Sequence, residues 1–225
     1  MVSYHHLFRE VIRLRLTPFP WRELKYLWWF PVYLATYLLC EQLITTDYLA
    51  TQTAADALIP FCEWFVIPYC LWYPLLIAVG LWLLTRDQEG YRRYMDHLAV
   101  TFLSCALIWL LIPNGQDLRP LFLPRDNPAI RIVELLYSLD TNTNVFPSVH
   151  VVGSLCAATA VWRTSALPRR SPAHFAVAVL AVFICLSTLF IKQHALADAL
   201  GALVLWLVTL PLVYGRRSTS PSPAD

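Results

Sequence analysis

The chain has 225 residues, of which 58% are apolar and only 14% carry a charge, and its formal net charge is +2. Soluble globular proteins have about 25% charged residues, so this composition indicates an integral membrane protein. The small net charge provides no basic field for a nucleic acid, and the length fits a single membrane domain. The six cysteines have no metal-type spacing, and we interpret them as apolar packing residues.

The apolar runs predict an all-α membrane protein, a six-transmembrane helical bundle formed by residues 26–214. The expected spans, in chain order, are 26–46, 61–85, 97–113, 147–163, 174–191 and 194–214. The third is short for the roughly 20 residues that a span needs. Pro68 and Pro74 predict kinks in the second span.

The two ends of the chain are polar. Residues 1–25 are expected to form a basic cytoplasmic arm, in which residues 7–16 are either a short helix on anionic lipid or a solvated segment. Residues 215–225 are rich in serine and proline, and we expect a disordered cytoplasmic tail.

The longest polar segment between the spans, residues 114–146, contains an amphipathic pattern. A helix is predicted from Pro128 to about Leu139, because apolar residues recur there at helical spacing: Ile130, Val133 and Tyr137. Asp126 or Asn127 can cap it, with Pro128 in the first position. We expect this short helix to lie on the outer surface of the membrane, in the loop between spans three and four.

The basic residues predict the orientation. With six spans, thirteen of the seventeen lysines and arginines lie on the side of the two termini. The positive-inside rule therefore puts both termini in the cytoplasm, and we expect a multi-pass protein of the plasma (cytoplasmic) membrane. This topology brings five polar residues from distant segments to the outer face: Arg119, Ser148, His150, Lys192 and His194.

Polar residues interrupt the last two apolar runs at Lys192, His194 and Asp198. A charge in the middle of a membrane costs about 2.5–3.5 kcal/mol, so such residues pair, face a wet cavity or do chemistry. His194 and Asp198 are four residues apart and share a face if they are helical, so the carboxylate can fix the tautomer of the imidazole. The alternative is a polar pair at a membrane boundary or at a helix interface.

A second polar group opens the fourth run, in the sequence Pro147-Ser148-Val149-His150. Proline suits the first turn of a helix, and the amide groups of a helix N-terminus favour anions. Further upstream, Arg119-Pro120 lies in the polar segment. An arginine there can bind phosphate oxygens with its two-pronged guanidinium group.

The order of these pieces, Arg119-Pro120, then Pro147-Ser148-x-His150, then Ser187-x6-His194-x3-Asp198, resembles the type 2 phosphatidic acid phosphatase superfamily. That superfamily includes membrane lipid phosphatases, lipid phosphotransferases and soluble vanadium haloperoxidases, and the resemblance covers roughly residues 119–198. Three positions depart from the motifs, where a lysine, a glycine and an arginine are usual: Ile112, Val149 and Thr188. Lys192 is the candidate for one missing cation. These departures resemble the sphingolipid-type phosphotransferase branch.

The resemblance implies a catalytic group of His194, Asp198 and His150, without a metal or another cofactor. His194, oriented by Asp198, would attack phosphorus to form a phosphohistidine, and His150 would protonate the leaving alcohol. The phosphate would be bound by the other polar residues of the motifs: Arg119, Ser148, Lys192 and Ser187. No cluster of carboxylates accompanies these residues to hold magnesium.

The expected function is an integral membrane lipid phosphatase that hydrolyses a phosphomonoester or pyrophosphate lipid. The first alternative is a lipid phosphotransferase, an inositol- or sphingolipid-type synthase. The second is a transporter or channel with a polar cavity. Single residues also have simpler interpretations: Arg119 as a head-group anchor, Lys192 as a snorkelling lysine and Ser148 as a helix cap. We interpret three acidic residues as solvated at the interface: Glu41, Asp56 and Glu63.

Overall fold

The computed structural model describes residues 19–44 and 46–215, so the predictions for residues 1–18 and 216–225 lie outside it. Within these ranges the chain is mostly helical. The α-helices are α2 (Trp29–Leu43), α3 (Val66–Cys70), α4 (Trp72–Arg86), α5 (Gln88–Leu111), α6 (Pro128–Leu139), α7 (Val149–Arg163), α8 (Pro172–Phe190) and α9 (Leu196–Tyr214). Short 3-10 helices are η1 (Trp21–Leu27), η2 (Ala54–Leu58) and η3 (Glu63–Phe65). Strand β1 (Leu49–Ala50) pairs in parallel with β2 (Asn114–Gly115).

Four helical segments of the described chain are long and apolar enough to cross a membrane: Glu63–Arg86, Gln88–Leu111, Pro172–Phe190 and Leu196–Tyr214. The chain is therefore an α-helical membrane protein, as its composition predicts. Helices α2 and α7 have 15 residues each, fewer than the roughly 20 that a full span needs. Every predicted span thus contains a helix, and four of the six overlap a helical segment of spanning length.

The third predicted span is longer than expected. Helix α5 begins at Gln88 instead of His97, so Arg92 and Arg93 lie on its first turns and not in a loop. The Asp87 side chain accepts a hydrogen bond from the amide of Gly90 and caps the helix. Salt bridges support this polar start, since Arg92 pairs with Glu23 and Arg93 with Glu89.

The second predicted span is interrupted, as its prolines suggest. Helix α3 ends at Cys70 and α4 begins at Trp72, with Leu71 between them. Pro74 has no N–H to donate to the carbonyl of Cys70, and its ring crowds that carbonyl. This break places Tyr69 and Trp72 at the level where the candidate site lies.

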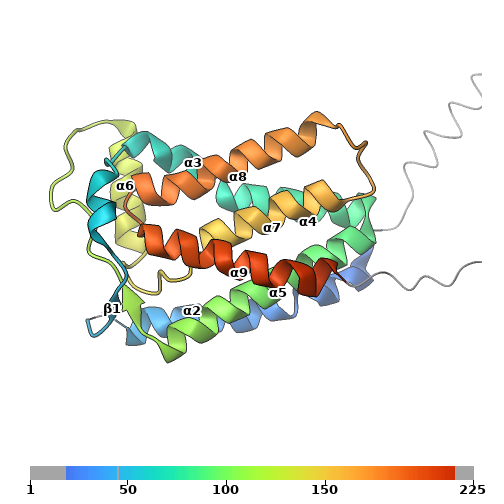
Figure 1. Ribbon diagram of the computed structural model, residues 1–225, viewed down its shortest axis with the longest axis horizontal. Coiled ribbons are helices and arrows are strands. Elements are labelled where there is room, and N and C mark those ends of the chain that lie inside the picture. The colour runs from blue at the N-terminus through green and yellow to red at the C-terminus, as the bar shows by residue number, and fades with distance from the viewer. Residues whose placement is uncertain (1–18, 45, 216–225) are drawn as a thin grey trace, which may run out of the picture.

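Helix α7 is at the centre of the bundle and packs against α4, α5, α8 and α9. Small buried residues on α7, among them Gly153 and Ala157, let these neighbours approach closely. Figure 1 shows an elongated bundle with α6 across one end and the C-terminal end of α9 at the other.

The predicted helix 128–139 is confirmed as α6, with Pro128 as its first residue. Asn127, one of two proposed caps, accepts a hydrogen bond from the amide of Ile130. Ala129 and Val133 of α6 form a small second core with Val66, Tyr69 and Ile191. The helix therefore covers the end of the bundle at which α3 starts and α8 ends.

Candidate active site

His150 lies in the first turn of α7, as predicted, at the end of the bundle covered by α6. Ser148 is the N-cap of α7: its hydroxyl accepts a hydrogen bond from the amide of Val151, and the residue is fully buried. The amide of Ser148 donates to the carbonyl of Asp198, which joins the starts of α7 and α9. The packing of these two helix ends therefore sets the position of His150.

The His150 ring is held between two aromatic rings. Its centroid lies 4.3 Å from those of Tyr69 and Trp72, and the ring is nearly parallel to Tyr69. Within the described part of the chain, its Nδ1 atom has no hydrogen-bond partner. The imidazole is thus fixed by stacking, while this nitrogen remains free for a ligand.

His194 and Asp198 are paired, although not in the way that their spacing suggests. His194 precedes α9, for which Ala195 is the N-cap, so the two residues do not share a helix face. The buried Asp198 carboxylate accepts a hydrogen bond from the amide of Ala195 at 2.7 Å. The same Oδ2 atom lies 3.5 Å from Nδ1 of His194, slightly longer than a hydrogen bond. The helix start therefore positions the carboxylate against the imidazole.

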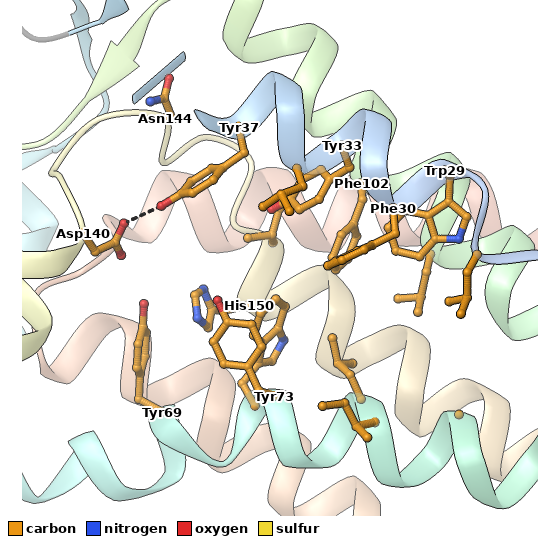
Figure 2. Close-up of a pocket in the computed structure, with 18 of the residues that line it drawn as sticks. Trp29, Phe30, Tyr33, Tyr37, Tyr69, Tyr73, Phe102, Asp140, Asn144 and His150 are labelled. Atoms are coloured by element: carbon orange, nitrogen blue, oxygen red, sulfur yellow. Dashed lines mark hydrogen bonds between the residues drawn. The ribbon is translucent and has the colours of Figure 1, made fainter. Parts of the chain in front are cut away.

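The two histidines face one cavity. Their ring centroids are 5.9 Å apart, and both line a pocket of about 610 Å³. Figure 2 shows His150 in the middle of this pocket, with Asp140 and Asn144 at one end and Trp29 and Phe102 at the other. The histidines thus lie where a polar end of the cavity meets a long aromatic and apolar part.

Asp140 is the carboxylate at the polar end, and sequence reasoning gave it no role. It accepts hydrogen bonds from the hydroxyl of Tyr37 at 3.0 Å and from Nε2 of Gln193 at 3.3 Å. Burial raises the pKa of Asp140, an effect that the Tyr37 hydrogen bond opposes. No motif surrounds Asp140 in the sequence, so nothing there marks it as a site residue. Gln193 is adjacent to the predicted nucleophile His194, and this position could have identified it as a candidate site residue.

Arg119 lies behind the cavity wall. Its guanidinium group donates to three backbone carbonyls, those of Tyr137, Asp140 and Thr141, and to the side-chain oxygen of Gln193. It also stacks on the ring of Tyr137, 4.5 Å from the centroid. Burial lowers the pKa of Arg119, while the nearby Asp140 acts in the opposite direction. The predicted phosphate ligand therefore holds the C-terminal end of α6 against Gln193.

Lys192 and Ser187 also lie outside the residues that line the cavity. The Lys192 ammonium donates to the carbonyls of Asp56 and Ile59, and burial lowers the pKa of Lys192. Its backbone is left-handed, with a φ of 55°. Ser187 donates to the carbonyl of Ile184, one turn earlier in α8.

Two acidic residues that we interpreted as solvated are instead buried. Asp56 and Glu63 are each only 1% exposed. Asp56 accepts from the amide of Leu196 and thereby fixes the start of α9, and Glu63 pairs with Arg125. The interpretation is wrong for both, because their partners come from segments that are distant in sequence.

Comparisons with known protein families, curated proteins and solved structures find no match. Among the described residues, there is no group of three or more histidine, cysteine or acidic side chains that could hold a metal ion. The site combines two imidazoles, a carboxylate next to one of them, and a helix N-terminus.

Proposed function

We propose that this protein is a membrane enzyme that hydrolyses a phosphate ester of a lipid through a phosphohistidine. The observation that carries the proposal is the pair of histidines facing one cavity, with ring centroids 5.9 Å apart. Two imidazoles that line the same cavity at this separation can both contact one bound phosphate group. His194 is the nucleophile, because Asp198 lies at its Nδ1 atom and can stabilise the charge that develops on the ring.

His150 is the general acid and then the base. It lies next to His194 in the same cavity, so it can protonate the leaving alcohol and later accept a proton from the attacking water. Both His150 and Val149, at the N-terminus of α7, line the cavity. Backbone amides in the first turn of a helix are unpaired within that helix and bind anions, which supports a phosphate in this place.

We also propose how the enzyme lies in the membrane. The enzyme crosses the bilayer six times, has both termini in the cytoplasm, and carries α6 on the outer surface. The basic residues support this orientation: Arg86 ends α4, Arg163 ends α7 and Arg169 lies in the loop between α7 and α8, all at the end of the bundle opposite α6. The active site then faces the outer side.

Phosphate release in detergent with EDTA present tests this function. Wild type is compared with His194→Ala and His150→Ala on a panel of phosphatidic acid, phosphatidylglycerophosphate and polyprenyl pyrophosphate. His174→Ala is the matched control, since His174 is a buried histidine at the start of α8, far from the cavity. Release that requires both histidines and no metal supports the proposal, and release that is untouched by either substitution rejects it.

A second candidate is a lipid phosphotransferase, in which an alcohol replaces water. It is favoured by the chemistry of the polar end, where Asp140 and Asn144 offer hydrogen-bond acceptors and no described lysine or arginine lines the cavity. A hydroxyl group donates a hydrogen bond to such acceptors, whereas a doubly charged phosphomonoester is repelled by a carboxylate. A lipid with a radiolabelled phospho-head-group is incubated with inositol or a sphingoid alcohol. Only a transferase moves the label onto the added alcohol, which gives a water-soluble product with inositol and a new lipid with the sphingoid alcohol.

A further inference from the structure

The apolar part of the cavity is a groove between α2 and α4. Both helices pack on α5, and Figure 2 shows side chains of α2 and α4 pointing into the cavity from opposite sides. Beyond the histidines the lining is aromatic or aliphatic, as at Trp29, Leu76, Met95 and Phe102. The phosphate chemistry proposed above uses the polar end alone and leaves this groove without a role.

The groove is open along its side. Several residues line the cavity and still expose 40–64% of their surface, namely Phe30 and Leu34 on α2 and Tyr73, Ile77 and Leu81 on α4. These residues form the two rims of the groove. In a membrane-spanning bundle, such rims face lipid, so a molecule can pass from the bilayer into the groove without crossing water.

The dimensions of the groove fit one hydrocarbon chain. The lining runs along α4 from Trp72 to Leu84, which corresponds to roughly 18 Å at 1.5 Å per residue. One leaflet contributes about half of the roughly 30 Å hydrocarbon core of a bilayer. A chain that begins at the histidines therefore lies in the groove over its whole length.

We propose that the groove between α2 and α4 binds one hydrocarbon chain of the lipid whose phosphate lies between the histidines, and that its depth near Gly80 selects chain length. The inference rests on the proposed function for the position of the phosphate. The occupant is a lipid chain, because the groove is continuous with the polar site and opens towards the membrane.

Gly80 offers a way to test the depth. A Cβ atom there would meet Tyr94 and Met95 at 3.7 and 3.8 Å, which is ordinary contact distance, so alanine is accommodated. Leucine adds its branched end towards Met95, inside the groove. Gly80 lies about 12 Å below Trp72 along α4, so this change shortens the groove and leaves the polar end intact.

The first experiment measures kcat/KM for octanoyl and palmitoyl forms of the same lipid phosphate. We expect Gly80→Leu to lower the value for the palmitoyl lipid about tenfold or more, by filling an apolar pocket, and to leave the octanoyl lipid unchanged. Gly80→Ala and Val208→Leu, a change on the exposed face of α9, should alter neither. An equal effect of Gly80→Leu on both lipids would overturn the inference.

The second experiment does not depend on activity. Phosphatidic acid with a diazirine at the end of one acyl chain is photolysed with wild type and with His194→Ala in lipid nanodiscs. Labels on Leu84, Met95 or Leu98 in both proteins, lost in Gly80→Leu, support the groove even if no phosphate is released. Labels confined to the outer faces of α8 and α9, or a cross-linked dimer of the chain with an unlabelled groove, would overturn it.

Discussion

The Asp198 carboxylate does two things with one oxygen atom. Its Oδ2 accepts the amide hydrogen bond of Ala195 and lies 3.5 Å from Nδ1 of His194. The cap at the start of α9 and the orientation of the imidazole therefore depend on the same group. This relationship separates the structural effect of Asp198 from its effect on His194, because an isosteric side chain keeps the first and changes the second.

Asp198→Asn should lower kcat about 10²–10⁴-fold, the range for loss of acid–base or positioning groups, with little change in Tm. The asparagine oxygen can still accept from Ala195 and lie beside Nδ1 of His194, but it lacks the negative charge that stabilises the positive charge developing on the imidazole. Asp198→Ala should lose activity and also stability, by about 0.5–2 kcal/mol for the lost cap. Steady-state kinetics and thermal unfolding in detergent check both, and a normal kcat in Asp198→Asn would contradict the assigned role.

Arg119→Lys should destabilise the protein by about 1.5–3 kcal/mol, because a lysine cannot keep the forked contacts with three carbonyls and Gln193. Arg131→Lys is the control, since Arg131 is exposed and pairs with the exposed Asp126. Thermal unfolding measures the stability. If Arg119→Lys raised KM without lowering Tm, Arg119 would instead be the phosphate ligand that its motif suggests.

Asp140→Asn should stabilise the protein more near neutral pH than near pH 4. Burial raises the pKa of Asp140, so the folded state binds this proton more tightly than the unfolded chain, whose aspartate pKa is about 3.9. Protonated Asp140 therefore stabilises the wild-type fold at a pH below the pKa of the unfolded chain. This stabilisation is lost as the pH rises through the higher pKa of the folded state. The measurement is the difference in Tm between variant and wild type at several pH values.

Gly201→Ala should destabilise the protein by about 1–3 kcal/mol, because a Cβ there would clash with the Phe146 ring and force it to move. Phe146 directly precedes Pro147 and Ser148, so the shift should also lower activity. Gly80→Ala is the matched helix variant with room for its Cβ, and the better helix propensity of alanine should stabilise it by about 0.5–1 kcal/mol. Equal Tm values for the two variants would argue against the packing shown here.

Asn127→Ala should cost about 1 kcal/mol for the lost cap of α6. Asn127 also donates to the buried Glu63, so the loss should exceed that of Asp126→Ala, at the other candidate cap. Thermal unfolding of the two variants decides between them. The test is specific because both residues are polar and adjacent, and only one of them accepts from the helix.

Three features could be predicted from the amino-acid sequence alone, namely the helical membrane class, the bounds of α6 and the position of His150 in the first turn of its helix. These features depend on local rules, namely the length of apolar runs, the recurrence of apolar residues and the conformation that proline imposes. Periodicity could not find Asp140, because its partners Tyr37 and Gln193 come from segments about 100 and 50 residues away.

The contacts of the charged side chains depend instead on how the helices and loops pack in three dimensions. The motifs predict Arg119 and Lys192 as phosphate ligands, yet both side chains donate hydrogen bonds to backbone carbonyls of neighbouring loops. The sequence predicts that Asp56 and Glu63 are solvated, yet both are buried, Asp56 with the amide of Leu196 and Glu63 with Arg125. A buried charge must be satisfied by whichever polar group the fold brings to it, and that group is set by packing between helices and not by sequence spacing.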